Sequence, residues 1–405
     1  MVKHYYLKKI MKRKILIDGR FIGVGDSIGR YTFGVLEHLL QIDKENSYSL
    51  LIRPAGVRQV QEHGLWNNER LKIEVLDIPH YSVVEQTKLL FWLNKKPFDL
   101  VYFTQFNHPA LYRKPYIIII HDMTTFGYFH YENPLKVVLF KKIMKSAVFD
   151  SKKIITASKH SQEEIIDFYK VDKKKIEVIY LGIDENYLRI SKMDQVDRVK
   201  LGAKFKKHYQ IVGDYLLYTG MWKKHKNLKR LLLAFEKQFA SGSQLSATGG
   251  IQLVLAGNVD YNEPEIIAEI ERINGHKIAE TKGGDLVFVA GFVPEVLLSA
   301  VYTGASVYIQ PSLNEGFGLP PLEAMSCGTP VVASNVSATP EILGDAALYF
   351  DPENVDDMAK KIAEIVADQR LRLDLQKRGL EQVKKYSWQE NAKKTLEVIN
   401  NVLGK

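Results

Sequence analysis

The feature that most constrains the fold of this chain is a repeated alternation of short apolar runs with helical patterns. In the first half, the apolar runs are candidate strands at 14–19, 49–52, 72–76, 100–103, 116–121, 153–156 and 176–180. Helical spacing of apolar residues is found between them, at 29–42, 134–149 and 161–169. Strands that are apolar throughout and alternate with helices are typical of a parallel sheet covered on both faces.

The second half repeats this pattern, so a second domain is expected. Candidate strands lie at 215–220, 252–256, 286–290, 306–310, 330–333 and 348–350. Candidate helices lie at 227–239, 264–273, 320–326, 355–368, 370–385 and 388–403. A chain of 405 residues is also too long for one ordinary core. We predict two doubly wound, Rossmann-like α/β domains, 1–195 and 196–385, that face each other across a cleft.

Two irregular stretches interrupt this pattern. The chain turns polar and irregular over 185–207, which we interpret as the linker between the domains, and 240–250 has the composition of a surface loop. Ligands of doubly wound sheets bind at the carboxyl ends of the strands. The site is therefore expected between the domains.

Cysteine content and hydropathy indicate a cytoplasmic chain. Cys327 is the one cysteine, which excludes an intramolecular disulfide and a cysteine-rich zinc site. Its neighbours Met325 and Gly328 favour a packing role for it over a reactive thiol. The basic N-terminus has no apolar core of signal-peptide length, and the longest apolar runs are too short to span a bilayer.

The positive charge is one-sided. Residues 1–190 hold 30 Lys and Arg against 21 Asp and Glu, whereas 191–405 is balanced. This suggests an anionic partner, although an ordinary basic surface is the alternative. The apolar segment 133–153, with lysines at Lys136, Lys141, Lys142 and Lys145, fits an anionic membrane surface or a core-packed helix with a solvated lysine face. We expect no nucleic-acid partner, because no recognition motif accompanies the charge.

The stretch "PSLNEGFGLPPLEAMSCGTP" (311–330) reads as a strand end, a glycine turn and a helix start. Proline is tolerated in the first turn of a helix, and glycine lets the backbone approach a ligand closely. The free N–H groups of 316–319 and the helix dipole would face an anion such as a diphosphate.

Glu315 and Glu323 flank this turn. Together they fit a sugar nucleotide, with the ribose at Glu323, the diphosphate in the middle and the donor sugar at Glu315. One alternative is that Glu323 is a helix N-terminal charge and Glu315 a solvated loop residue. Another is a glycosidase acid/base pair, which would require two carboxyls facing across a glycosidic bond.

The stretch "YTGMWKKHKNLKRLL" (218–232) again runs from strand to loop to helix. Lys223, Lys224, His225 and Lys226 crowd the loop, and cations there would neutralise a diphosphate leaving group without a metal. Lys226, beside Asn227 at the expected helix start, is the best single candidate.

These motifs carry a resemblance. Residues 314–352, "NEGFGLPPLEAMSCGTPVVASNVSATPEILGDAALYFDP", resemble the signature of the retaining glycosyltransferases of family four, including its Glu-x7-Glu motif. "YTGMWKKHKNL" resembles the family's phosphate loop, "IIIIHDMTTF" its His-Asp strand end and "SIGRYTFGVLEHL" its first helix. The resemblance covers nearly the whole chain.

The resemblance implies the two-domain GT-B fold. The C-terminal domain would hold the nucleotide sugar, the N-terminal domain the acceptor, and the last helix, 386–405, would cross back to the N-terminal domain. It also implies transfer with retention and no required metal, and the sequence has no Asp-x-Asp triplet. No residue stands out as a covalent nucleophile, and the resemblance implies a same-face route in which the leaving phosphate itself takes the acceptor proton.

The resemblance also assigns residues. Glu323 would hold the ribose, Glu315 the hydroxyls of the donor sugar, and Lys226 the leaving diphosphate. His121 would lie near the reaction centre; the alternative is a strand-end histidine capped by Asp122. Further donor contacts would come from Gly316, Phe317, Gly318, Leu319, Lys223, His225, Phe292, Val293, Ser27 and Gly29. Ser27 replaces a glycine of the usual loop, which leaves the contacts of that loop open.

The expected activity is transfer of a hexose from a nucleotide-diphosphate sugar, a co-substrate, to a glycan or lipid-linked acceptor. Surface polysaccharide or glycolipid synthesis at the inner face of the membrane is the expected setting. GDP-mannose is favoured as donor, with UDP-glucose and UDP-N-acetylglucosamine left open. A catalytically silent subunit of a glycosyltransferase complex is the alternative from another functional class. An epimerase or a sucrose- or glycogen-type synthase on the same fold is disfavoured by the glutamate pair and the short chain.

Overall fold

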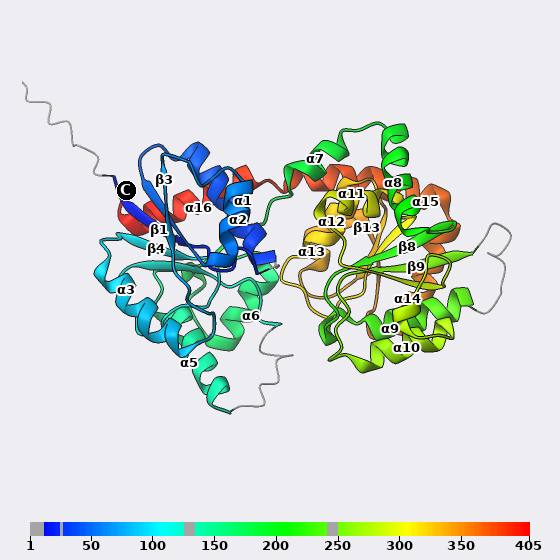
Figure 1. Ribbon diagram of the computed structural model, residues 1–405, viewed down its shortest axis with the longest axis horizontal. Helices are drawn as coiled ribbons and strands as arrows, with labels where there is room; N and C mark the ends of the chain where they lie inside the picture. Colours follow the sequence, from blue (N-terminus) through cyan, green and yellow to red (C-terminus); the bar gives the residue numbers. More distant parts are fainter. Residues whose placement is uncertain (1–11, 25–26, 125–133, 241–249) are drawn as a thin grey trace, which may run out of the picture.

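The computed structural model describes residues 12–24, 27–124, 134–240 and 250–405, which build two lobes, each around one parallel β-sheet (Figure 1). The strands of the first lobe are β1 (Lys14–Asp18), β2 (Ser47–Ile52), β3 (Leu71–Val75), β4 (Leu100–Phe103), β5 (Tyr116–Ile119), β6 (Lys153–Thr156) and β7 (Ile176–Val178). Those of the second lobe are β8 (Asp214–Thr219), β9 (Ile251–Ala256), β10 (Val287–Gly291), β11 (Val307–Gln310), β12 (Val331–Ser334) and β13 (Ala347–Phe350).

Helices cover both sheets. Those of the first lobe are α1 (Ser27–Ile42), α2 (Val57–Glu62), α3 (Leu90–Lys95), α5 (Pro134–Asp150), α6 (Lys159–Tyr169) and, from the end of the chain, α16 (Trp388–Leu403). Those of the second lobe are α7 (Glu185–Ser191), α8 (Gln195–Tyr209), α9 (Leu228–Phe235), α10 (Pro264–Asn274), α11 (Glu295–Gly304), α12 (Leu319–Ser326), α13 (Thr339–Leu343), α14 (Val355–Ala367) and α15 (Gln369–Gln382).

The strand order confirms the predicted fold class. The orders are β3-β2-β1-β4-β5-β6-β7 and β10-β9-β8-β11-β12-β13, and every neighbouring pair is parallel. The chain winds outward from β1 in one direction and then, from β4, in the other, and it does the same at β8 and β11. Ligands of such sheets bind outside the carboxyl ends of the strands at the point of reversal.

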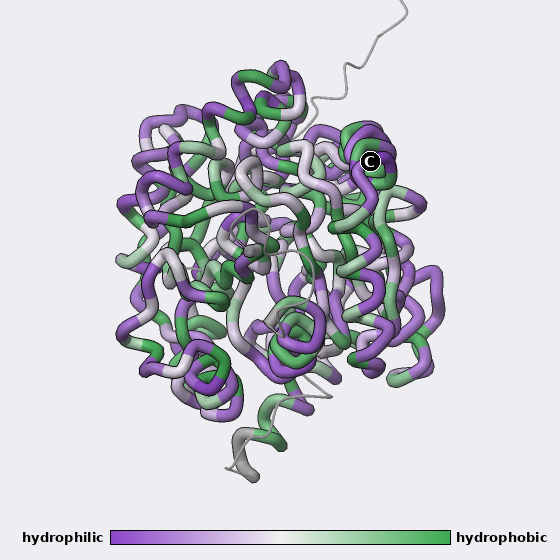
Figure 2. Tube along the Cα trace, turned by 90° about the vertical axis from the view of Figure 1, so that its right-hand side faces the viewer, coloured by the Kyte–Doolittle hydropathy of each residue, from purple (hydrophilic) through white to green (hydrophobic). Residues whose placement is uncertain are grey.

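The apolar strands are explained by burial on both faces. All residues of β4, β5, β9, β11 and β12 are buried. On β1, Ile15 and Ile17 pack into one apolar cluster and Leu16 into the cluster on the opposite face. Each predicted strand therefore appears within two residues of its expected bounds. Figure 2, which faces the second lobe, shows hydrophilic residues on the outer helices and hydrophobic residues further in.

The interpretation of 185–207 as an irregular linker is wrong. Most of this stretch is helical, in α7 and α8, and α8 packs against α11. The packing is close, because a Cβ on Gly202 would lie 2.6 Å from the Cα of Gly304. Gly202 and Phe205 are the buried residues of α8, which is too short an apolar stripe to reveal helical spacing. Of the predicted loop 240–250, residues 241–249 lie outside the described residues.

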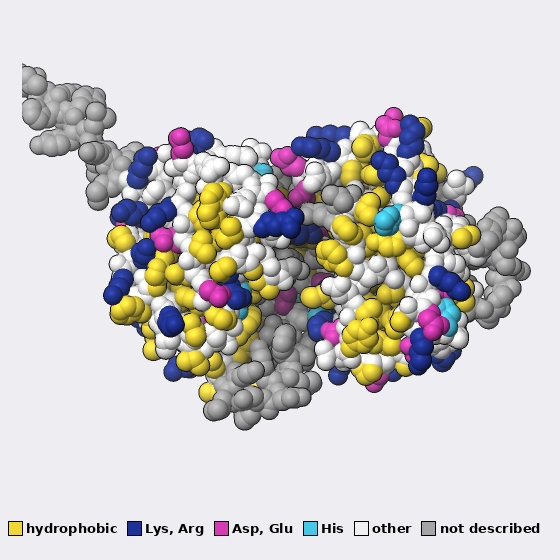
Figure 3. All heavy atoms as spheres, viewed as in Figure 1, with side chains coloured by type: hydrophobic (Ala, Val, Ile, Leu, Met, Phe, Trp, Pro, Cys, Tyr) yellow, Lys and Arg dark blue, Asp and Glu magenta, His cyan; other side chains and the backbone are white. Residues whose placement is uncertain are grey.

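Helix α5 is a core helix with lysines on its outer face. Ile143, Met144, Ala147 and Val148 are buried in the first lobe, whereas Lys141, Lys142 and Lys145 are exposed. This is the second of the two expected arrangements of the segment; the side chain of Lys136 lies outside the described residues. Figure 3 shows other Lys and Arg side chains around the outer margin of the same lobe.

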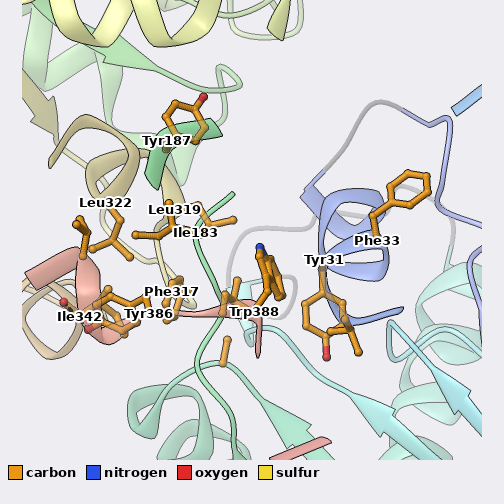
Figure 4. Packing of buried hydrophobic residues seen from close by; sticks show 14 of the residues in the cluster. Tyr31, Phe33, Ile183, Tyr187, Phe317, Leu319, Leu322, Ile342, Tyr386 and Trp388 are labelled. Atoms are coloured by element: carbon orange, nitrogen blue, oxygen red, sulfur yellow. Dashed lines mark hydrogen bonds between the residues drawn. The ribbon is translucent and has the colours of Figure 1, made fainter. Parts of the chain in front are cut away.

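The chain crosses between the lobes twice, after β7 and again between α15 and α16, and Trp388 lies at the crossing. Helix α16 packs against α1. Trp388 is 7% exposed and lies very close to two glycines. A Cβ on Gly34 would lie 2.4 Å from the nearest Trp388 atom, and a Cβ on Gly182 would lie 2.2 Å from the nearest one. Figure 4 shows Trp388 between α1 on one side and Phe317, Leu319 and Tyr386 on the other. The two lobes therefore share one continuous apolar core.

Candidate active site

Glu315 lies in the loop after β11, and its carboxylate is held from within the second lobe. Its Oε1 accepts hydrogen bonds from Lys226 Nζ and Ser312 Oγ, both at 2.7 Å, and from the Gln310 side-chain amide. The Glu315 side chain is 12% exposed. The alternative that it is a solvated loop residue is therefore wrong.

The charge state of Glu315 follows from these contacts. Burial by itself would raise the pKa of the carboxyl, but the Lys226 ammonium and the hydrogen bonds from Lys226 and Ser312 outweigh burial and lower it. All three hydrogen bonds end on Oε1, and the described part of the chain places no donor on Oε2. Glu315 is thus a fixed, ionised carboxylate, and within the described residues its Oε2 is left for hydroxyl groups of a ligand.

Glu323 lies on α12 and is 2% exposed. Its Oε2 accepts a hydrogen bond from Tyr302 Oη on α11 at 2.8 Å, and its Oε1 accepts one from Arg30 Nη2 at 2.7 Å. Arg30 belongs to α1, so this ion pair joins the two lobes. The carboxylate raises the pKa of the Arg30 guanidinium, which keeps the guanidinium charged. Two other helices thus hold Glu323, which makes it more than a charge at the start of α12.

The loop after Glu315 approaches the first lobe very closely. A Cβ on Gly316 would lie 2.5 Å from the carbonyl oxygen of His121, so a side chain at this position would clash. Gly318 precedes α12 with a φ of +86°, which also favours glycine. The ring of Phe317 packs between Tyr180 and Tyr386. In the described residues, no acceptor takes the backbone N–H groups of 316–318, which leaves them available to an anion.

His121 follows β5 and lies against this loop. Its Nε2 is 3.2 Å from the carbonyl oxygen of Thr104. A carbonyl only accepts, so Nε2 carries a proton and the neutral ring has its acceptor at Nδ1. Burial lowers the pKa of the ring, which favours this neutral form. Asp122, the residue expected to cap His121 in the alternative reading, accepts the backbone N–H of Thr124 at 2.9 Å.

Within residues 223–226, which we call the lysine loop, the side chain of Lys226 hydrogen bonds to Glu315. Lys223 instead forms an ion pair with Asp260, at 2.5 Å, in the loop after β9. Lys224 is exposed, and the backbone carbonyl of His225 accepts the N–H of Leu313 at 2.7 Å. Burial and the neighbouring Lys226 lower the pKa of the His225 ring.

Asn227 fixes this loop, a role that the sequence did not reveal. It has a φ of 60° and is 5% exposed. Its side-chain amide donates to the carbonyl oxygens of Pro311 at 3.0 Å and Pro352 at 2.8 Å. Asn227 thereby ties the lysine loop to the end of β11, the strand that carries the Glu315 loop.

Asn227→Ala is expected to lower the free energy of unfolding by about 3 kcal/mol, measured by urea denaturation. Two buried carbonyls lose their donors, and alanine is strained at positive φ. Asn227→Gly is the matched control, because it removes the same hydrogen bonds without the backbone strain and should cost about 1 kcal/mol less. Equal stability of Asn227→Ala and wild type would contradict this role.

A cavity of about 660 Å³ lies between the lobes. Phe292, Val293 and Leu319 line it from the second lobe, and Gly29 and Arg30 from the first. The Phe292 side chain is 71% exposed and the Val293 side chain is buried. Ser27 is the first residue of α1, but its side chain lies outside the described residues. Of the expected donor contacts, Gly29, Phe292, Val293 and Leu319 thus line this cavity, whereas Glu315, Glu323, Lys226 and His121 are not among its lining residues.

Glu341 is a second contact between the lobes that was not predicted. From α13, its carboxylate accepts the backbone N–H groups of Lys159 at 2.8 Å and His160 at 3.1 Å. It also accepts the Tyr180 hydroxyl at 2.9 Å. These N–H groups open α6, where an anion is favoured by the helix dipole. Glu341 and Arg30 therefore each link the two lobes.

Three further features concern Cys327, metal-binding clusters and membrane-spanning helices. Cys327 is 3% exposed, and burial raises its pKa to about 12, which supports a packing role. Among the described residues, three or more His, Cys, Asp or Glu side chains nowhere gather as a metal site would require. Within the same residues, every helix is too short or too polar to span a membrane.

The sequence matches two family descriptions. Residues 206–382 match glycosyl transferases group 1, and residues 54–187 match glycosyltransferase family 4. The chain is 30% identical over 281 residues to O-antigen chain mannosyltransferase B of Escherichia coli, covering 69% of this chain and 68% of that protein. It is 29% identical over 253 residues to the serotype-specific mannosyltransferase WbdA of Escherichia coli, covering 62% of this chain but only 29% of that protein.

The fold has counterparts of known structure. Anabaena Alr3699/HepE in complex with UDP-glucose superposes with a TM-score of 0.73 at 15% identity, over 96% of this chain and 99% of that one. The family matches, the mannosyltransferase relatives and the two parallel sheets therefore agree: this chain belongs to the group 1 glycosyltransferases of family 4 and has their GT-B architecture.

Proposed function

We propose that this glycosyltransferase moves mannose from GDP-mannose, with retention at the anomeric carbon, to a glycan or lipid-linked acceptor in surface polysaccharide synthesis. The observation that carries the proposal is the arrangement of Glu315, Lys226 and Glu323. The ionised carboxylate of Glu315 accepts a hydrogen bond from the Lys226 ammonium, and the glycine turn that follows Glu315 leads into α12, the helix that carries Glu323.

The donor would lie along the cleft on the second lobe. Phe292 would stack on the base, and Glu323 would accept the ribose hydroxyls once these displace the Arg30 guanidinium from Oε1. The diphosphate would meet the N–H groups of 316–318 and the Lys226 ammonium. The donor sugar would hydrogen bond to Oε2 of Glu315, close to His121.

In the proposed reaction the acceptor hydroxyl oxygen bonds to the anomeric carbon on the face from which the diphosphate departs. The bond between that carbon and the phosphate oxygen breaks, and the departing oxygen takes the acceptor proton. Lys226 would stabilise the charge that develops on the diphosphate, which is why we propose that no metal is required. Glu315 would orient the sugar and stabilise its oxocarbenium-like character.

The first lobe would bind the acceptor. Its wall of the cavity carries side chains suited to hydroxyl groups: Glu37, Gln41, Gln59, Glu62 and His63. The basic surface around α5 is consistent with a lipid-linked acceptor presented by an anionic membrane. GDP-mannose is favoured because the relatives are named as mannosyltransferases; UDP-glucose and UDP-N-acetylglucosamine are the alternatives.

The test is thermal stabilisation of the purified protein by GDP, UDP, ADP and dTDP, with and without Mg²⁺, followed by a transfer assay with the matching sugar nucleotide. We expect GDP alone to raise the melting temperature, equally with and without Mg²⁺, and to do so weakly in Glu323→Gln. A shift with UDP alone would overturn GDP-mannose as donor. Binding of a nucleotide with no transfer to any glycan acceptor would favour the silent-subunit alternative.

A further inference from the structure

The two site carboxylates are joined by a chain of buried hydrogen bonds that the proposed reaction does not yet use. From Glu323 the chain runs through Tyr302 to Thr219, with a Tyr302 Oη to Thr219 Oγ1 distance of 2.9 Å. From Thr219 it continues to Tyr308 at 3.3 Å. Tyr308 Oη donates to Gln310 Oε1 at 2.8 Å, and the Gln310 amide donates to Glu315.

The four residues between the two carboxylates are buried, and two of them come from one face of one strand. Tyr308 and Gln310 on β11, and Ser312 just beyond it, are at most 2% exposed, and they alternate with Ile309 and Pro311. Thr219 lies at the end of the neighbouring strand, β8. Alternate residues of a strand point to the same face, so Tyr308, Gln310 and Ser312 form a line along one face of the β11 segment. A buried polar line is costly unless its members satisfy one another.

The donors along the chain can be assigned one by one. The Gln310 amide nitrogen faces the Glu315 carboxylate and Ser312 Oγ, so its carbonyl oxygen needs a donor, and the Tyr308 hydroxyl is that donor. The Tyr302 hydroxyl proton goes to Glu323. The single hydroxyl proton of Thr219 is then left to be shared between the oxygens of Tyr302 and Tyr308.

On this basis we propose that Tyr302 and Tyr308 are positioning residues for the two halves of the donor. Tyr302 orients Glu323 for the ribose, Tyr308 orients Glu315 for the sugar through Gln310, and the Thr219 hydroxyl couples the two. The inference rests on the proposed function, because it assumes that the two carboxylates bind the ribose and the sugar of one donor.

The roles predict different kinetic effects for two similar substitutions. Tyr302→Phe is expected to weaken nucleotide binding about tenfold and to raise KM, with kcat within about threefold of wild type, since a hydrogen bond to a charged group is lost. Tyr308→Phe is expected to lower kcat about tenfold with nucleotide affinity unchanged.

A pH profile provides a second readout for Tyr308. Without its donor, the Gln310 amide is held less firmly, and its hydrogen bond to the Glu315 carboxylate, which favours the ionised form, is weakened. The pKa of Glu315 then rises, so the acid limb of kcat should move to higher pH in Tyr308→Phe and stay in place in Tyr302→Phe.

The matched control is Tyr215→Phe. Tyr215 lies on β8 and is fully buried, and its hydroxyl donates to the carbonyl of Val301, which is not part of the hydrogen-bond chain between the two carboxylates. It should lose stability as the other two variants do, but keep wild-type KM, kcat and pH profile. If Tyr302→Phe and Tyr308→Phe behave like Tyr215→Phe, the tyrosines have only a structural role and the inference is overturned.

The coupling through Thr219 is tested by combining substitutions. We expect the effects of Tyr302→Phe and Tyr308→Phe on kcat/KM to be non-additive in the wild-type background and additive in Thr219→Val, which keeps the shape but lacks the hydroxyl. Additivity in both backgrounds overturns the coupling. Wild-type protein is assayed in parallel with GDP and GDP-mannose. If it neither binds GDP nor transfers mannose, the donor assignment fails; if it does both, a negative result concerns the tyrosines alone.

Discussion

Glu315→Gln is expected to slow sugar transfer by about two to three orders of magnitude. The substitution keeps the size of the side chain but removes the negative charge that Lys226 and Ser312 hold in place. Glutamine would orient the sugar less strictly and would not stabilise positive character at the anomeric carbon. Initial rates of transfer measured at saturating donor would show this loss directly.

The same variant should bind the nucleotide normally. Glu315 is expected to contact the sugar and Glu323 the ribose, so GDP affinity should stay within about threefold of wild type in Glu315→Gln and fall in Glu323→Gln. Glu265→Gln is the matched control, because Glu265 lies on the same lobe with a 73% exposed side chain paired to Lys229. A wild-type transfer rate in Glu315→Gln would show that Glu315 does not position the donor.

Lys226→Met separates the charge of the lysine from that of the glutamate. The Lys226 ammonium is the main favourable contribution that lowers the pKa of Glu315, against the opposing effect of burial. Without it, burial dominates, the pKa of Glu315 rises, and the carboxylate takes up a proton at higher pH. The variant should therefore lose activity on acidification at a higher pH than wild type does. The double variant Glu315→Gln/Lys226→Met should transfer sugar only a little more slowly than the slower of the two single variants, since the two residues act as a unit.

The sequence predicted every strand, because most of the strands are apolar from end to end, as β4, β5, β9 and β12 are. The short helices α2, α3, α11 and α13 were not predicted, and the prediction failed at α8, where a glycine contact replaces an apolar stripe. Within the site, Lys226 hydrogen bonds to Glu315, a contact that was not predicted, and the Glu315 loop lies on His121.

What could not be predicted comes from the opposite lobe or from elsewhere in the sheet. Arg30 reaches Glu323 across 293 residues of sequence, and nothing local marks it as that partner. Glu341 reads as an ordinary helix charge until α6 is placed opposite it. The hydrogen-bond chain between Glu323 and Glu315 did leave a signal in the sequence. Polar residues alternate along the otherwise apolar strand end "VYIQPS", at Tyr308, Gln310 and Ser312.

Trp388→Ala is expected to lower the free energy of unfolding by about 4 kcal/mol, the largest stability effect expected for a single substitution in this chain. The indole fills the space between α1 and the crossing segment, in the apolar core that the two lobes share (Figure 4). Its removal leaves a cavity in this shared core. Urea unfolding followed by circular dichroism would measure the loss, with Trp66→Ala, at a 38% exposed tryptophan, as the matched control.

A compensating substitution makes this prediction specific to the lobe junction. Gly34→Ala alone should be strongly destabilising, because its Cβ would lie 2.4 Å from the Trp388 ring. In the Trp388→Ala background the same Cβ enters vacated space, and alanine also favours the middle of a helix by about 1 kcal/mol over glycine. Gly34→Ala should then be neutral or stabilising. If it destabilises both backgrounds equally, the close contact between α1 and Trp388 does not determine how the lobes are held together.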